Sequence, residues 1–225
     1  MLYYVQMAYE IMEGSPGLRL DEVAHVLLPG RGRNQTGDGL SKIGEQRTDY
    51  AADFYIDQLL SEINGVIVPT GYKTPRDKAG VLWMPEDSNE QFRGIPEADC
   101  TKARLILRGI GASAIHVERH SIDTVTNFAR SEAEGHFPDD RPTVIVAQGP
   151  QLERIIERIA PRTLRREFMG IVVPEVDEPD PDKAMLKLVS SAELLWYNPD
   201  TKNIVKKTTR NSNVVWGIVG ALHLA

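Results

Sequence analysis

The sequence contains only one cysteine, Cys100, among its 225 residues. A single cysteine cannot form an intramolecular disulfide bond, and it cannot supply a zinc site built from several cysteines. A chain without disulfides is typical of a reducing compartment, so we expect a cytoplasmic protein.

The chain also lacks an apolar run long enough to cross a membrane. The longest apolar stretch, residues 214–225, is shorter than the roughly 20 residues that a spanning helix requires. We interpret it as a docked helix or strand. Residues 1–14 lack a cationic start followed by an uninterrupted apolar run, so they do not predict a secretory signal. We therefore expect no membrane association.

An excess of positive charge is missing as well. The chain has 26 Lys and Arg against 32 Asp and Glu, a net charge of −6. An acidic protein gains little from attraction to a phosphate backbone, so nucleic acid is not an expected partner. The local basic clusters Arg31/Arg33 and Arg162/Arg165/Arg166 are still suited to a small anion.

Five short apolar runs alternate with segments of helical periodicity. The runs lie at residues 23–28, 66–68, 114–117, 143–147 and 168–173. One helical segment, 41–63, places Ala51, Phe54, Tyr55 and Leu59 on one side, and the other, 151–159, has the apolar stripe Leu152, Ile155, Ile156 and Ile159. Apolar strands alternating with helices predict βαβ units and a mostly parallel sheet with helices on both faces, which is an α/β fold. We expect one domain over residues 1–225, with a C-terminal helical extension at about 183–225.

Two segments interrupt this alternation. Residues 71–96 are rich in Gly, Pro and charge without a clear period, which predicts a long loop or lid. Residues 174–183 are acidic and rich in proline, which predicts a surface connection.

Glycines and arginines follow the first predicted strand. In a parallel sheet ligands bind beyond the carboxyl ends of the strands, so the residues after each strand are candidates for a site. Gly30, Arg31, Gly32 and Arg33 offer backbone amides and charge to a phosphate or carboxylate. The pattern is neither a complete G-x-G-x-x-G motif nor a Walker loop, and an ordinary flexible turn explains it equally well.

Polar side chains follow three later strands or open the helices after them. Thr70 and Gly71 form a sharp turn after the second strand, and Glu97 opens a helix, where the helix dipole alone explains an acid. Glu118 closes the third strand, and Ser121 is placed as the N-cap of the next helix. Asp123, Thr124 and Asn127 then share the polar arc of that helix, and Gln151 and Arg154 follow the fourth strand. The simpler interpretations are that the segment from Ser121 to Asn127 begins a capped helix with a solvated face, and that Arg154 is a surface arginine.

These motifs occur in the same order in the YdcF/SanA/ElyC family, which the chain resembles over about residues 23–174. The most specific part of the family pattern is E-x-x-S-x-N-T-x-x-N. The matching positions are Glu118, Ser121, Thr124 and Asn127, together with Arg47 and Arg154 as the two family arginines. The resemblance implies a Rossmann-like sheet with a site at its strand ends. One branch of the family is associated with S-adenosylmethionine, and others with envelope assembly through a membrane anchor that this chain lacks.

Two positions depart from the family pattern. Asp123 replaces the family asparagine, and Gln151 stands where the family has a histidine. Glutamine forms hydrogen bonds but does not transfer protons near neutral pH, so a reaction that depends on histidine is in doubt.

Two further likenesses are weaker. Residues 27–32, 40–47 and 144–155 are similar to the histidine phosphatases, but Pro29 to Arg31 and Gln148 to Gly149 stand where both histidines are required. His116, Glu118 and His120 alternate along the chain, so on a strand they would share one face and could bind a metal. A strand that continues to His120 conflicts, however, with a helix cap at Ser121. We predict no metal site, with His116 partly buried and neutral and His120 in a loop.

The sequence thus predicts a small-molecule site for an anionic ligand, with a nucleotide or S-adenosylmethionine implied by the resemblance. Glu118 is the predicted general acid or base, because burial at a strand end raises a carboxyl pKa. The predicted ligand-binding residues are Gly30, Arg31, Gly32, Arg33, Arg47, Thr70, Gly71, Glu97, Ser121, Asp123, Thr124, Asn127, Gln151 and Arg154. The alternative is a non-catalytic binding or regulatory protein on the same fold. The sequence leaves the reaction and the oligomeric state open.

Overall fold

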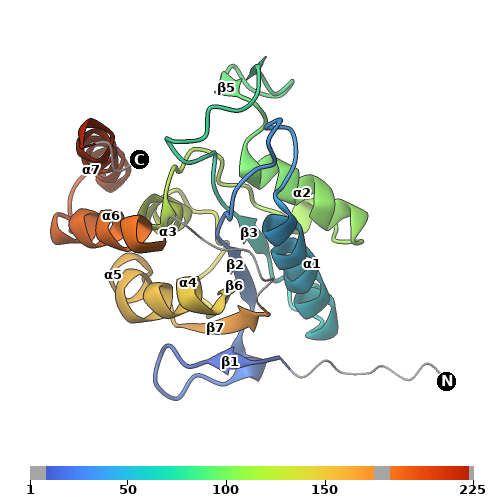
Figure 1. Ribbon diagram of the computed structural model, residues 1–225. Helices are drawn as coiled ribbons and strands as arrows, with labels where there is room; N and C mark the ends of the chain where they lie inside the picture. Colours follow the sequence, from blue (N-terminus) through green and yellow to red (C-terminus); the bar gives the residue numbers. More distant parts are fainter. Residues whose placement is uncertain (1–8, 175–182, 223–225) are drawn as a thin grey trace.

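The computed structural model describes residues 9–174 and 183–222, and it contains a five-stranded, mostly parallel sheet (Figure 1). The strand order is β1-β7-β6-β2-β3, and only β1 runs antiparallel to its neighbour. The strands are β1 (Ile11–Met12), β2 (His25–Leu28), β3 (Ile67–Pro69), β6 (Thr143–Gln148) and β7 (Phe168–Val173). Mixed α/β structure and a mostly parallel sheet are therefore confirmed.

The direction of the strand order reverses between β2 and β6. From β2 the chain continues to β3 on one side, whereas from β6 it continues to β7 on the other side. The two central strands pair with each other in parallel, with Val26 opposite Val144. Their carboxyl ends therefore open a crevice at the position where open α/β sheets bind ligands.

The strand predicted at residues 114–117 is not formed. A short 3-10 helix covers Ala112–Ala114, and the chain then runs beside β3 with two isolated bridges, Ile67 to Ile115 and Thr70 to Glu118. The amides of His116 and Glu118 donate to carbonyls of Ile67 and Pro69 at 2.9 and 3.0 Å. The segment is extended at the edge of the sheet, but Pro69 of β3 has no N–H to donate, so the bridges on either side of it stay isolated.

Helices α1 (Lys42–Asp57) and α2 (Glu97–Leu107) lie on one side of the sheet (Figure 1). Ser41 caps α1 by accepting a hydrogen bond from the Gly44 amide at 3.1 Å. The helix ends earlier than the predicted residue 63. Leu59 has a positive φ of 52° and is 55% exposed, so its predicted place on the core side is wrong. Leu60 is buried instead.

The opposite face is covered by α3 (Thr124–Ala133) and by a continuous helical segment formed of α4 (Gly149–Arg154), a π-helical turn (Ile155–Ile159) and α5 (Ala160–Thr163). The predicted apolar stripe is confirmed, because all four of its residues are buried: Leu152, Ile155, Ile156 and Ile159.

Side chains of β2 alternate between two core clusters, as a strand requires. Val26 and Leu28 belong to the cluster that includes Phe54 of α1, while Leu27 belongs to the cluster that includes Phe128 of α3. Both faces of the sheet are thus buried, which explains why its strands read as continuous apolar runs.

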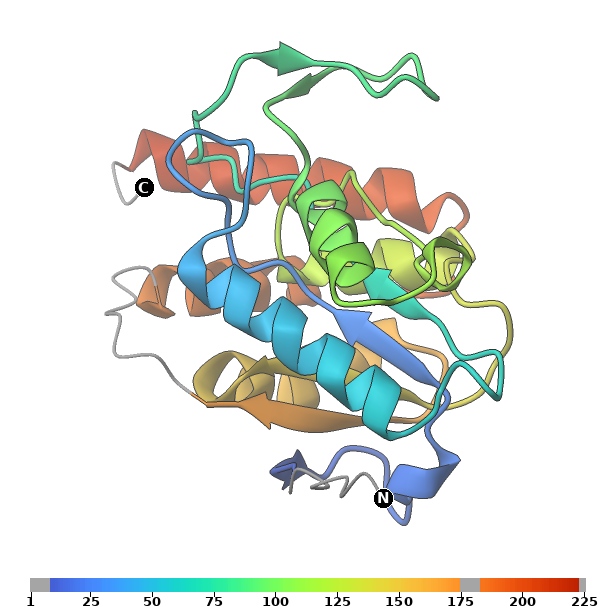
Figure 2. The ribbon, with the colours of Figure 1, turned by 90° about the vertical axis from the view of Figure 1, so that its right-hand side faces the viewer.

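Residues 71–96, predicted as a loop or lid, contain a small antiparallel pair formed by β4 (Leu82–Trp83) and β5 (Phe92–Arg93). These two strands lie apart from the main sheet, at the top of Figure 2. Each of these strands has only two residues, so no alternation of apolar and polar side chains marks them in the sequence.

The C-terminal region forms α6 (Lys183–Leu195) and α7 (Ile204–Ala221), and α7 packs against α3 and α6. The apolar stretch predicted to dock, 214–225, lies in α7 as far as Ala221, and residues 223–225 lie outside the described residues. The predicted acidic connection also falls outside them, at 175–182. No helix in the described ranges is both long and apolar enough to span a membrane.

Candidate functional site

A cleft of about 390 Å³ opens at the carboxyl edge of the parallel sheet, over the ends of β2 and β6. Most of the residues predicted from sequence line it. These are Gly30, Arg31, Gly32, Gly71, Glu97, Ser121, Asp123, Thr124, Asn127, Gln151 and Arg154. Four predicted residues do not line it, namely Arg33, Arg47, Thr70 and Glu118.

Glu97 occupies the amides of the glycine loop. Its Oε1 accepts hydrogen bonds from the backbone amides of Arg31 and Gly32, the latter at 2.6 Å. Burial raises the pKa of Glu97, while the two amides and the charges of Arg47 and Arg31 act in the opposite direction. The amides that we predicted for a ligand anion therefore bind a carboxylate of the protein itself.

Glu97 also lies close to Asn127 across Gly71. A Cβ placed on Gly71 would be 3.8 Å from both Glu97 Oε2 and Asn127 Oδ1. Gly71 has a φ of +113°, a conformation that favours glycine. The sharp turn after β3 thus brings a carboxylate and an amide together in the wall of the cleft.

Arg47 lies beneath the cleft and connects the ends of β2 and β6. It is 1% exposed and donates to the Pro29 carbonyl at 2.6 Å, to Gln148 Oε1 at 2.9 Å and to Gln151 Oε1 at 2.8 Å. All these acceptors are uncharged oxygens. Burial, followed by the nearby charge of Arg31, lowers the pKa of Arg47 to about 9, against the opposing charge of Glu97.

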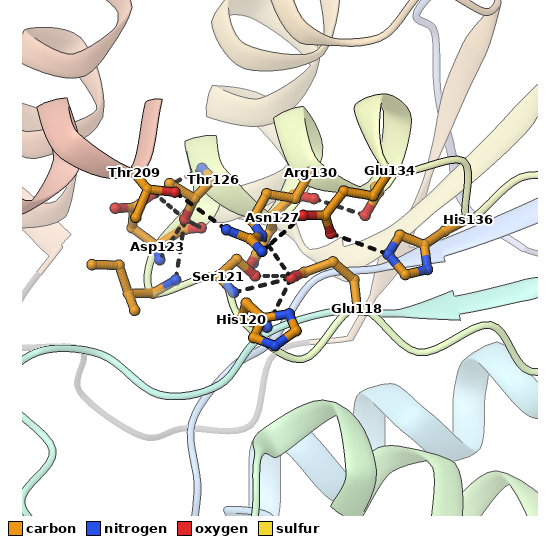
Figure 3. Close-up of polar contacts among 12 residues, drawn as sticks. Glu118, His120, Ser121, Asp123, Thr126, Asn127, Arg130, Glu134, His136 and Thr209 are labelled. Carbon is orange, nitrogen blue, oxygen red and sulfur yellow. Dashed lines mark hydrogen bonds and ion pairs between the residues drawn. The ribbon is translucent and has the colours of Figure 1, made fainter. Parts of the chain in front are cut away.

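Glu118 lies behind the cleft wall and is fully buried (Figure 3). Its Oε1 accepts from the amides of His120 at 2.8 Å and Ser121 at 3.1 Å, and from Arg130 Nε at 3.1 Å. Its Oε2 accepts from the Ser121 hydroxyl, which also contacts Asn127 Oδ1. Glu118 therefore holds two residues of the cleft wall in place, and both of its oxygens are engaged.

The predicted cap at Ser121 is wrong, because Asp123 caps α3 instead. Asp123 Oδ1 accepts from the Thr126 amide at 2.8 Å, and the Thr126 hydroxyl lies at 2.8 Å from the same oxygen. Asp is as good an N-cap as Ser. Since Glu118 engages Ser121, the helix begins two residues later than a Ser121 cap implies.

The second oxygen of Asp123 faces the C-terminal helices. Oδ2 accepts from the Ser212 hydroxyl and from Trp216 Nε1 at 3.3 Å. Glu193 of α6 lies beside it and is 3% exposed. Burial, followed by the neighbouring charge of Asp123, raises the pKa of Glu193 to about 10. Two neighbouring carboxyl groups shielded from solvent cannot both ionise easily, so Glu193 is protonated near neutral pH.

Arg154 connects three helices at the rim of the cleft. It donates to the Leu186 carbonyl at 2.7 Å and to Ser190 Oγ at 3.0 Å, both on α6, and to Thr124 Oγ1 of α3 at 3.3 Å. Arg154 and Thr124 therefore place the C-terminal region as well as lining the cleft.

Arg33 and Thr70 have structural surroundings outside the cleft. The guanidinium of Arg33 donates to Asp77 Oδ2 at 2.7 Å and to the carbonyls of Arg93 and Ile95 at 2.9 and 3.1 Å. Arg33 thereby anchors the segment that contains β4 and β5. Thr70 is 1% exposed and extends the pairing of β3 with β2.

Within residues 9–174 and 183–222, one group of side chains has the spacing of metal ligands: Glu118, His120 and Glu134, whose ligand atoms lie within 4.8 Å of one another. Arg130 pairs with Glu118 at 3.1 Å and with Glu134 at 2.8 Å (Figure 3). The guanidinium thus neutralises the two carboxylates that a cation would need, and the group forms an ion-pair network. His116 belongs to a different contact, with the His136 carbonyl at 2.6 Å.

Several lining residues were missed from sequence. They include Lys73, Gln148, Glu153, Arg158, Lys187 and Trp216. Gln148 ends β6 and could have been found, because every residue at a strand end is a candidate. Lys187 and Trp216 come from α6 and α7, and no local pattern tells which part of the sheet these helices cover.

Fold and cleft together define an α/β protein with a candidate ligand site at the carboxyl edge of a parallel sheet. No protein-family model matches the chain, and no curated protein or solved structure matches it at a significant level. The YdcF-like assignment therefore stays a prediction from the motifs.

Proposed function

We propose that this protein binds an anionic small molecule in the cleft above β2 and β6. The observation that carries the proposal is the position of the cleft, at the point where the strand order reverses. Crevices at this position are the general ligand sites of open α/β sheets. We also propose that the protein has the three-layer Rossmann-like fold of the YdcF-like family. The two core clusters on opposite faces of the sheet support this fold.

The electrostatics of the cleft favour an anion. Its basic lining residues are Arg31, Lys73, Arg154, Arg158 and Lys187, with Arg47 buried beneath. Of its four acidic lining residues, Glu153 and Glu157 are exposed, whereas the other two are engaged within the protein. Glu97 binds loop amides, and Asp123 binds Ser212 and Trp216. Partly buried cations attract an oxyanion more strongly than exposed ones, since solvent screens them less. Nucleotides and S-adenosylmethionine are the first ligands to test, on the motif resemblance alone.

This proposal covers an enzyme that acts on the bound molecule and a protein that only binds it, and two observations favour the purely binding role. Glu118, the predicted acid or base, is fully buried and does not line the cleft. Gln151, at the family histidine position, has its oxygen bound by Arg47. Turnover of a bound nucleotide or S-adenosylmethionine by the purified protein would favour the enzyme, and binding without turnover would favour this alternative.

A thermal-shift screen with pyrophosphate, citrate, AMP, ATP and S-adenosylmethionine tests the proposal. A ligand at about 100 times its dissociation constant adds about 2.7 kcal/mol of stability, a shift of several degrees. We expect stabilisation by at least one of these phosphate- or carboxylate-bearing ligands, weakened by Arg158→Glu at the cleft and retained in Arg162→Glu, an exposed arginine outside it. No shift with any of them, or equal loss in both variants, would contradict an anion site in this cleft.

A further inference from the structure

We propose that the side-chain amides of Gln148 and Gln151 form an oxyanion subsite in the floor of the cleft, oriented by Arg47. This inference rests on the proposed function and names the groups that recognise the anion. Gln148 lines the cleft and is 7% exposed. Its Nε2 is buried and has no hydrogen-bond partner among the described parts of the chain.

Arg47 determines which way both amides face. Gln148 Oε1 accepts from Arg47 Nε at 2.9 Å, and Gln151 Oε1 accepts from the Arg47 guanidinium at 2.8 Å. A guanidinium only donates hydrogen bonds, so a reversed amide would place two donors against each other. The NH₂ groups of Gln148 and Gln151 must therefore point away from Arg47, and both residues line the cleft.

The unpartnered NH₂ group of Gln148, with the amide of Gln151 bound to the same arginine, determines which chemical groups the subsite can bind. A buried donor left without a partner destabilises the protein, so an acceptor oxygen that binds Gln148 Nε2 recovers that free energy. Carboxylate and phosphate oxygens accept hydrogen bonds and carry negative charge, whereas an amine only donates. The buried charge of Arg47, which contacts uncharged oxygens alone, favours the anion further. The subsite thus fits a carboxylate or a phosphate group.

Gln148→Glu separates this role from a structural one. The new carboxylate still accepts from Arg47, so we expect the variant to unfold no more easily than the wild type. It has no NH₂ donor, and it places negative charge in the subsite. We therefore expect the affinity for pyrophosphate and for citrate, measured by titration calorimetry, to fall by about tenfold or more. Gln91→Glu, at an exposed position of the β4–β5 segment, makes the same change of charge and should bind like the wild type.

A second readout observes the amides directly. In a ¹⁵N spectrum of the side-chain amides, the Gln148 pair is the one that disappears in Gln148→Glu, and we expect it to shift when the bound anion is added. A response to pyrophosphate alone would assign the subsite to phosphate, and a response to citrate alone would assign it to carboxylate. Failure of the wild type to bind any ligand of the thermal-shift screen would overturn the proposed anion site itself. Wild-type affinity in Gln148→Glu, with an unmoved Gln148 pair, would overturn the subsite alone.

Discussion

The carboxylate of Glu97 lies where a side chain on Gly30 would lie: a Cβ at Gly30 would be 2.6 Å from Glu97 Oε2. The far end of a glutamate is normally free to move, but here Oε1 is held by two backbone amides. We therefore expect Gly30→Ala to break those contacts and lower the free energy of unfolding by about 1–3 kcal/mol. Urea unfolding of the variant and the wild type measures the difference.

Gly111→Ala is the matched control for that substitution. No heavy atom lies within 4 Å of a Cβ at Gly111, and its φ of −61° suits alanine. We expect a change within about 0.5 kcal/mol. Equal stability of Gly30→Ala and Gly111→Ala would show that Glu97 is not held by the loop in the way the contacts indicate.

Arg47 joins the loop after β2 to the end of β6, and Arg47→Met should loosen that junction. The variant leaves the oxygens of Pro29, Gln148 and Gln151 without their donor. Removing a buried charge offsets part of this loss, since burying a guanidinium is itself unfavourable. We expect a net loss of about 1–3 kcal/mol in unfolding free energy. Arg19→Met, which removes an exposed ion pair with Asp21, should cause no measurable change, and a similarly silent Arg47→Met would be evidence against the junction.

The buried pair of Glu118 and Arg130 should behave as one unit. Arg130→Met leaves Glu118 fully buried without its cation, which we expect to cost about 3–5 kcal/mol. Glu118→Gln should cost less, because its amide oxygen still accepts from the amides of His120 and Ser121. A double-mutant cycle by urea unfolding then gives a double variant that is more stable than the sum of the single losses predicts. Strict additivity would mean that the two residues are not coupled.

The same variant tests the catalytic prediction for Glu118. If Glu118 only positions Ser121 and Asn127, Glu118→Gln should retain most of the binding of any anion found in the screen. The predicted general acid or base instead requires that turnover of a bound nucleotide or S-adenosylmethionine be abolished while the fold remains intact. Pairing affinity with turnover in one preparation distinguishes these roles.

The sequence could predict the sheet because its physics is local. Strands buried on both faces are continuous apolar runs, and Gly30, Gly71 and Gln151 reach one cleft because parallel strands end at the same edge. The strand predicted at 114–117 has a similarly apolar sequence but does not form, because only isolated bridges join it to β3.

The sequence could not predict which hydrogen-bond partner a residue has when several candidates exist or when the partner lies far away along the chain. Two good caps, Ser121 and Asp123, compete at the start of α3, and the buried carboxylate of Glu118 decides between them. The amides after β2 look open to a ligand until Glu97, 65 residues later, is seen to bind them. Such choices depend on three-dimensional proximity, which residue spacing does not encode.

Glu193 should make the stability of the wild type depend on pH. Its pKa is raised from 4.5 to about 10, through burial and the neighbouring Asp123, with Ser212 and Arg154 opposing the shift. Between these values the folded protein keeps a proton that the unfolded chain releases, so the free energy of unfolding falls as pH rises from about 4.5 towards about 10. The contribution is fully present only below the unfolded pKa.

Glu193→Gln removes this proton but keeps a neutral donor beside Asp123, so the variant should lose less stability as the pH rises. Urea unfolding at about pH 5, 7 and 9 should give a gap between variant and wild type that widens steadily in favour of the variant. Glu157→Gln, at an exposed position on the rim of the cleft, removes a carboxylate without this surrounding and should follow the wild-type curve. Parallel curves for Glu193→Gln and the wild type would mean that Glu193 ionises normally. In that case Asp123 would hold Ser212 and Trp216 of α7 without a protonated neighbour.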